Sequence, residues 1–130
     1  MYEQVTRGIR VSVESDYLDD QSEPYENHYV WAYTVQIDNT SDQVVTLKSR
    51  RWEITDSRGL TEIVSGEGVV GEQPVLHPGE AYEYTSGAPL KTPSGIMVGA
   101  YSMETEAGDR FDVAVPAFSL DSPHEIVQLN

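Results

Sequence analysis

The sequence predicts an all-β fold, a two-sheet antiparallel β-sandwich. Several short segments alternate apolar and polar residues, turn residues separate them at frequent intervals, and no segment shows a convincing helical period. Residues 65–103 are the most informative, because their Gly and Pro residues stand between short apolar segments and exclude a long helix. Strands of this kind bury one face each, so the core is expected between the inner faces of two sheets.

The first half of the chain contains two clear strands and an acidic loop. Residues 7–16 alternate, with Ile9, Val11 and Val13 on one face. Residues 14–27 hold six acidic side chains and no basic one, and this polarity together with Pro24 predicts an exposed loop. Residues 29–39 form a second strand with large apolar side chains on one face, and the polar residues 38–42 supply a turn.

The third predicted strand, residues 44–55, changes its inward phase. Val45 and Leu47 occupy odd positions, whereas Trp52 and Ile54 occupy even ones, so the change falls near residues 50–51. A β-bulge would shift the phase within one strand. Two shorter strands joined by a bend would do the same.

Four further strands are predicted in the second half, at residues 60–65, 81–86, 96–104 and 111–115, and residues 66–79 are expected to be mostly irregular. Pro116 limits the ladder of the last strand, which residues 118–120 could resume. Large aromatic side chains on inward positions should anchor the core, since burying each one stabilises the fold by roughly 1.5–3 kcal/mol. The expected anchors are Trp31, Tyr33, Trp52, Tyr101 and Phe111.

Length, charge and composition limit the function. The 130 residues fit one domain, 1–130, and they include no Cys, no apolar run long enough to span a bilayer and no N-terminal secretory pattern. We therefore expect a cytoplasmic protein without membrane insertion. A net charge of −14 repels nucleic acid, so direct nucleic-acid binding is not expected. The basic cluster of Lys48, Arg50 and Arg51 is interpreted as a charged outer strand face that discourages edge pairing.

Gly66, Gly68 and Gly71 have the spacing of a dinucleotide-binding fingerprint. That motif requires a helix N-terminus, whereas Pro74 follows here, and two Glu residues place negative charge where a phosphate would lie. Three interpretations remain: a structural loop that requires positive φ, a loop that binds a protein partner, and an anion-binding or nucleotide-binding loop. In the first two, Val69 and Val70 contact the core or a partner.

No other pattern indicates a reaction or a cofactor. The acidic stretch 16–26 could associate weakly with divalent cations, but it lacks the spacing of a calcium loop. His28, His77 and His124 are too scattered for a transition-metal site. The serines beside glycines lie outside any Gly-x-Ser-x-Gly pattern, so an enzyme is not expected, and a nucleotide hydrolase is the weakest alternative.

Residues spread over most of the chain carry a family resemblance. They are Trp52, 54–56, 66–74, Leu76, 78–80, 84–87, Leu90, 92–95, Met97, Gly99, Tyr101, Met103, 111–113, Pro116, Phe118 and Leu120. In these positions the chain resembles the ApaG domain family. The resemblance implies a fibronectin type III-like or immunoglobulin-like sandwich, and a link to cobalt and magnesium resistance or efflux. It also implies protein–protein binding, because the domain is appended to eukaryotic F-box proteins and to a DNA-polymerase-interacting protein.

The sequence therefore favours a non-catalytic protein-interaction module that affects cobalt and magnesium homeostasis indirectly. The candidate partner-binding residues are Gly66, Gly68, Val69, Val70, Gly71, Glu72, Gln73, Pro74, Tyr84 and Tyr101. The two tyrosines qualify if they border a groove beside the loop. The partner would be a protein of unknown identity, and a homodimer through an edge strand is a further expectation. The alternative is a protein that binds divalent cations or a phosphate compound, through the acidic loop or the glycine loop.

Overall fold

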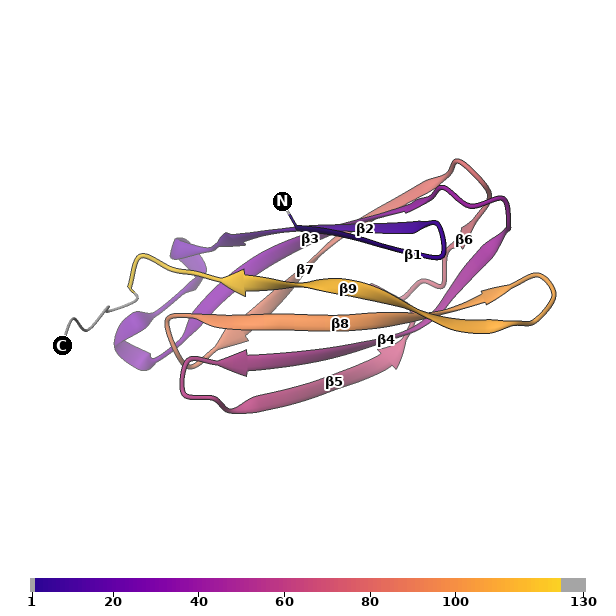
Figure 1. Ribbon diagram of the computed structural model, residues 1–130. Coiled ribbons are helices and arrows are strands. Elements are labelled where there is room, and N and C mark those ends of the chain that lie inside the picture. The colour runs from indigo at the N-terminus through magenta and orange to yellow at the C-terminus, as the bar shows by residue number, and fades with distance from the viewer. Residues whose placement is uncertain (1, 125–130) are drawn as a thin grey trace.

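The computed structural model describes residues 2–124 and confirms the predicted sandwich of two antiparallel sheets (Figure 1). The first sheet has the strand order β1-β2-β3-β7 and the second β5-β4-β8-β9, with β6 paired to β4. The strands of the first sheet are β1 (Tyr2–Thr6), β2 (Ile9–Tyr17), β3 (Tyr29–Asn39) and β7 (Ala81–Leu90). Those of the second are β4 (Val45–Asp56), β5 (Thr61–Glu67), β6 (Val75–Leu76), β8 (Gly95–Thr105) and β9 (Arg110–Leu120).

The acidic segment after β2 connects the first two long strands. It contains two short 3-10 helices, η1 (Asp19–Gln21) and η2 (Pro24–Glu26), and none of their residues is buried. The exposed position predicted for this segment is therefore confirmed. Within residues 2–124, no helix has the length and apolar character needed to cross a membrane.

The N-terminal strand β1 was not predicted, and the strand predicted at 7–16 begins later, at Ile9. Arg7 and Gly8, with φ of 49° and 80°, make the two-residue turn that joins β1 to β2. Most of β1 is exposed on both faces, so its sequence shows no alternation from which a strand could be predicted. The Arg7 guanidinium lies over the Phe111 ring, 4.3 Å from its centroid, and ties this turn to β9.

A β-bulge causes the phase change in β4, as one of the two interpretations predicted. The pairing of β4 with β8 shifts between Leu47 and Ser49, so Lys48 is the extra residue. The bulge lies slightly before the predicted position at residues 50–51. A second irregularity sets Pro116 and Ala117 opposite Val98 in the pairing of β8 with β9. This explains how β9 accommodates a proline and continues to Leu120.

Two other predicted boundaries were wrong. Strand β7 extends four residues beyond the predicted end at residue 86. Gly87 and Pro89 obscured its pattern, but an edge strand tolerates Pro because one side makes no ladder bonds. The segment 66–79 is more ordered than expected, since it contains β6 and an isolated bridge between Val69 and Glu72.

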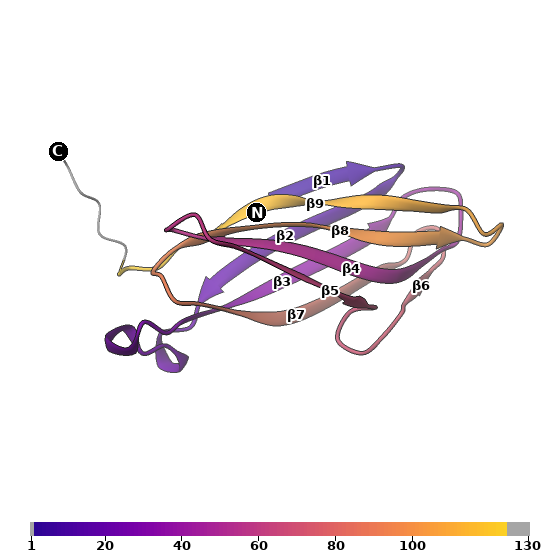
Figure 2. The ribbon, with the colours of Figure 1, turned by 90° about the horizontal axis from the view of Figure 1, so that it is seen from below.

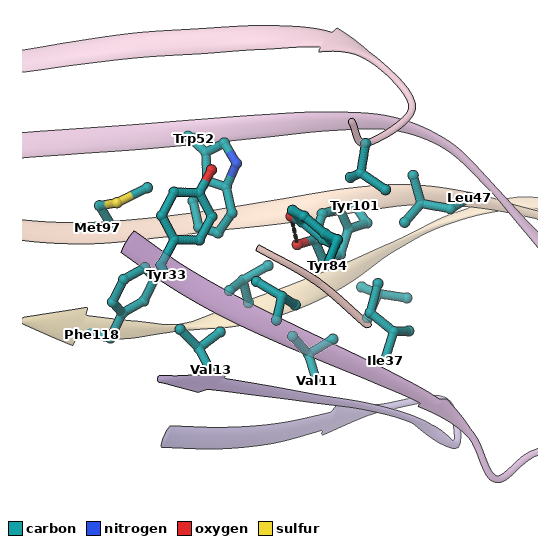
Figure 3. Close-up of a cluster of buried hydrophobic side chains, with 14 of the residues drawn as sticks. Val11, Val13, Tyr33, Ile37, Leu47, Trp52, Tyr84, Met97, Tyr101 and Phe118 are labelled. Carbon is teal, nitrogen blue, oxygen red and sulfur yellow. Dashed lines mark hydrogen bonds between the residues drawn. The ribbon is translucent and has the colours of Figure 1, made fainter. Parts of the chain in front are cut away.

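Aromatic side chains from both sheets meet in one core (Figure 3). Trp52 packs edge-on against Tyr33 and Tyr101, with ring centroids 5.4 and 6.2 Å away. Four of the five expected anchors are buried, whereas Phe111 is only half-buried beside Arg7. Phe118, which directly follows the irregularity at Pro116 and Ala117, is the fully buried phenylalanine.

The two long sides of the sandwich differ. On one side β1 lies along β9, so the edge strands of the two sheets cover each other (Figure 2). On the other side the edges are β5 and β7. The candidate residues of the segment 66–74 lie on this second side, where β5 ends.

Candidate functional site

The glycine-rich segment that ends β5 and leads into β6 folds as a tight hairpin of residues 66–74. The Val69 N–H donates to the Glu72 carbonyl at 2.8 Å, and the Glu72 N–H donates back to the Val69 carbonyl at 2.9 Å. Between them, Val70 and Gly71 have φ of 47° and 80°. Positive φ at both central residues is typical of a type I′ turn, whose twist matches the strands on either side.

The bulge in β4 holds this hairpin in place. The carbonyl of the bulged Lys48 accepts hydrogen bonds from the Gly68 N–H at 2.9 Å and from Gln73 Nε2 at 2.8 Å. Arg50 Nη1 donates to the Glu67 and Gly68 carbonyls at 3.1 and 2.8 Å. Because a bulged residue is left out of the regular ladder, its carbonyl is free for such contacts. The phase change and the hairpin are therefore parts of one local structure.

Gly68 and Gly71 are required for different reasons. A Cβ at Gly68, where φ is 63°, would lie 2.2 Å from the Glu72 carbonyl oxygen. A Cβ at Gly71 would meet nothing within 4 Å, although φ there is 80°. Gly68 is therefore needed both for its backbone angle and for close packing, and Gly71 for its backbone angle alone.

The two adjacent valines of the hairpin have opposite environments. Val69 is fully buried in the core, whereas Val70 is 62% exposed at the tip. A β-branched residue in the left-handed region costs roughly 1–2 kcal/mol, and Asn or Gly would normally occupy this turn position. Because Val70 is mostly exposed, burial of its side chain does little to offset that cost.

Tyr84 and Tyr101 lie in the core, so neither ring is exposed for direct contact with a partner. Their exposed fractions are 7% and 0%, and their hydroxyl groups are hydrogen-bonded to each other (Figure 3). Burial raises the pKa of both phenols, so both remain neutral. The pair belongs to the packed platform beneath the hairpin.

Tyr82 is the tyrosine that contacts the hairpin. It is half-buried on β7, and its hydroxyl donates to Glu72 Oε2 at 3.0 Å. Partial burial and this hydrogen bond raise the pKa of Tyr82. Sequence reasoning could not separate Tyr82 from Tyr84, because both occupy inward positions of one strand and only their distance from the strand end distinguishes their burial.

The geometry does not favour phosphate binding by the hairpin. Gly68, Val69 and Glu72 already donate their backbone N–H groups within the protein. The segment leads into a strand, β6, and supplies no helix N-terminus. The exposed carboxylates of Glu67 and Glu72 would also repel an anion.

The acidic stretch likewise shows no assembled cation site. Glu23 and Glu26 lie close together, and the hydrogen bond and charge repulsion between their carboxyl groups raise the pKa of Glu26. However, in the part of the chain that the structure describes, no group of three or more His, Cys, Asp or Glu side chains is placed to hold a metal ion. A hard cation prefers more oxygen ligands than such a pair provides.

A cavity of about 380 Å³, which sequence reasoning missed, lies where β5 begins and β7 ends. Ile54, Leu60 and Leu90 contribute apolar walls, and Glu62, Lys91 and His28 are among its polar neighbours. These residues come from distant parts of the chain, and no single segment carries a signal for the cavity. Its size is within the range of ligand pockets.

Comparisons with known proteins agree on one family. The family model for the ApaG domain matches residues 19–105. The chain is 63% identical over 130 residues to Protein ApaG of Paramagnetospirillum magneticum, covering 100% of both chains. It is 59% identical over 124 residues to Protein ApaG of Rhodospirillum centenum, covering 95% of each. The crystal structure of the ApaA protein from Bordetella pertussis is 46% identical, with a TM-score of 0.86 over 90% of this chain and 95% of that one.

Proposed function

The chain belongs to the ApaG domain family, and from that premise we propose that it is a non-catalytic interaction module that binds a protein partner through the hairpin of residues 66–74. The hairpin stands on a packed sandwich and presents side chains that the fold itself does not need. Loops held by a rigid scaffold are the usual place for binding residues.

Val70 carries this proposal. Its side chain is 62% exposed at φ 47°, where an Asn or a Gly would relieve strain. Such strain persists where the surrounding structure holds it, and it is concentrated at binding sites. The neighbouring Gln73 and Tyr82 side chains are themselves hydrogen-bonded, which keeps the surroundings of the tip ordered for a partner.

The proposed effect on cobalt and magnesium is indirect and operates through the partner, in the cytoplasm. The absence of an assembled group of metal ligands among residues 2–124 supports an indirect effect. The net charge of −14 favours a partner whose binding surface is basic.

Replacing Val70 with Asn separates binding from folding. We expect Val70→Asn to raise the free energy of unfolding by about 1 kcal/mol, because Asn adopts the left-handed region with less strain. We expect the same variant to recover less of the partner from a lysate of the source organism. Urea unfolding and affinity capture with mass spectrometry measure the two effects.

Val5→Asn is the matched control, since Val5 is 56% exposed on β1, on the covered side of the sandwich. It should retain every partner of the unmodified protein. Recovery of all partners by Val70→Asn would show that the hairpin is not the binding surface. If the unmodified protein captured no protein above background, the proposed function itself would be wrong. Gly68→Asp is unsuitable here, because its Cβ would collide with the Glu72 carbonyl.

A further inference from the structure

Strand β5 offers an unpaired edge. Its seven residues pair on one side with β4, from Thr55 opposite Thr61 to Ser49 opposite Glu67. Within residues 2–124, no strand pairs with its other side. Proteins usually protect such an edge with Lys, Pro or a covering element, because its free N–H and C=O groups pair with any extended chain.

The other three edge strands are better protected. β1 and β9 lie against each other on the opposite side of the sandwich (Figure 2). β7 contains Pro89, which has no N–H to offer. β5 contains neither Pro nor Lys, and it carries exposed Ile63 in its middle. Among the four edge strands of residues 2–124, β5 is the one with neither a covering strand nor a proline.

The cavity of about 380 Å³ adjoins this edge, because Leu60, Thr61 and Glu62 line it as β5 begins. Glu62 pairs with Ile54, which also lines the cavity, so the cavity continues the inner face of the sheet. Side chains alternate along a strand. A chain added beside β5 would therefore direct an inward side chain into the cavity, and backbone bonds would supply affinity while the cavity supplied specificity.

We propose that the β5 edge binds an extended, basic segment of another protein, with one apolar side chain of that segment in the cavity. Glu62 and Glu67 lie on β5 and Glu53 is paired with Ile63, which favours a basic chain. A second copy of this protein is disfavoured, because each copy carries −14. The inference rests on the proposed function in that the occupant is a protein, but it uses a surface separate from the hairpin tip.

The test uses a display library of random peptides long enough to span β5, selected on the intact protein. We expect selected peptides to alternate apolar residues with Lys or Arg. In an NMR titration with a selected peptide, backbone amides of residues 60–66 and of Lys91 should shift. Glu62→Lys should lower the affinity for the peptide by about tenfold or more. Leu60→Ser, which removes an apolar wall of the cavity, should lower it by a similar factor.

Two variants control for charge and for exposed apolar surface. Glu106→Lys makes the same charge change on an exposed turn outside β5, and Val5→Ser removes an exposed apolar side chain from β1. Both should bind the peptide as the unmodified protein does. Equal weakening within either pair of test and control variants would overturn the proposal, because peptide binding would then follow net charge or exposed apolar surface in general and not the β5 edge.

Other outcomes also overturn it. One is a library that yields no binding peptide, and another is a set of NMR shifts confined to residues outside β5 and the cavity. A third is a dimer whose interface, mapped by NMR shifts, lies at residues 61–66, because a second copy would then be the occupant. The failures of the two proposals are distinguishable. Val70→Asn should leave peptide binding at β5 unchanged. If this variant lost the protein partner while no peptide bound at β5, the hairpin proposal would stand and the edge proposal would be rejected.

Discussion

Replacing Gly68 with Ala is expected to lower the free energy of unfolding by about 3 kcal/mol, a large effect for a residue outside any regular strand. The new Cβ would lie 2.2 Å from the Glu72 carbonyl oxygen, which belongs to the backbone and cannot turn aside. The positive φ adds a penalty of roughly 1 kcal/mol or more. Relief would require the hairpin to open and to give up the Gly68 N–H bond to the Lys48 carbonyl.

Gly71→Ala is the matched control, since Gly71 also has positive φ but meets no atom within 4 Å of a built Cβ. It should lower the free energy of unfolding by about 1 kcal/mol, which is the cost of the strained backbone angle alone. Urea unfolding followed by tryptophan fluorescence measures both variants. Equal losses for the two would contradict the close packing of Gly68 against Glu72, because only Gly68 has that contact.

Replacing Trp52 with Ala should lower the free energy of unfolding by about 3–5 kcal/mol, the usual range for removing a large aromatic side chain from a core. The ring is 2% exposed and packs edge-on against Tyr33, Tyr101 and Phe118. It also lies against Gly99, where a Cβ would be 2.7 Å from the ring. Side chains from both sheets meet on Trp52, so its loss should weaken the contact between the sheets (Figure 3).

Phe variants of the two tryptophans isolate the hydrogen-bond contribution. Trp52 Nε1 is buried without a partner, so Trp52→Phe loses ring volume and no hydrogen bond. Trp31 Nε1 donates to the Asp121 carbonyl at 2.8 Å, so Trp31→Phe should cost about 1 kcal/mol more than Trp52→Phe. Thermal or urea unfolding compares the variants. A loss below about 1 kcal/mol for Trp52→Ala would show that Trp52 does not join the sheets.

The hairpin and the β5 edge are neighbours in the fold, so one partner could contact both surfaces at once. β5 runs directly into residues 66–74, and the same β4 strand supports β5 through its ladder and the hairpin through Lys48 and Arg50. A chain lying along β5 from the cavity would end near the hairpin. Binding at two adjacent surfaces of one partner raises affinity without new contacts at either.

Where one face of a strand is buried and the other is not, the sequence predicted the structure well. The alternation in β2 and β3 identified both strands. The phase change in β4 indicated either a bulge or a bend, and the structure has the bulge. β1 was not predicted because most of it is exposed on both sides. The end of β7 was placed too early because Gly87 and Pro89 interrupt its alternating pattern. Periodicity reports burial, so strands with no strongly buried face carry little of it.

For the candidate site, the sequence identified a glycine-rich segment that the structure shows as an ordered hairpin, but it could not assign roles within that segment. The glycine spacing indicated positive φ, which the structure has at Gly68 and Gly71. It could not show that Val69 points into the core while Val70 points out, since adjacent apolar residues in a turn follow no strand period. The cavity beside β5 depends on contacts between residues far apart in the chain, which a pattern within one segment cannot predict.

Binding through Val70 requires the hairpin to be a preformed projection and not a flexible loop that is ordered by its partner. Backbone ¹⁵N relaxation of the free protein at Val70 and Gly71 tests this directly. We expect order parameters of about 0.85, equal to those of β4, because the turn bonds and the Lys48 contacts hold the tip. Values below about 0.6 at both residues would contradict the account, since a tip that mobile could not keep Val70 in its strained conformation.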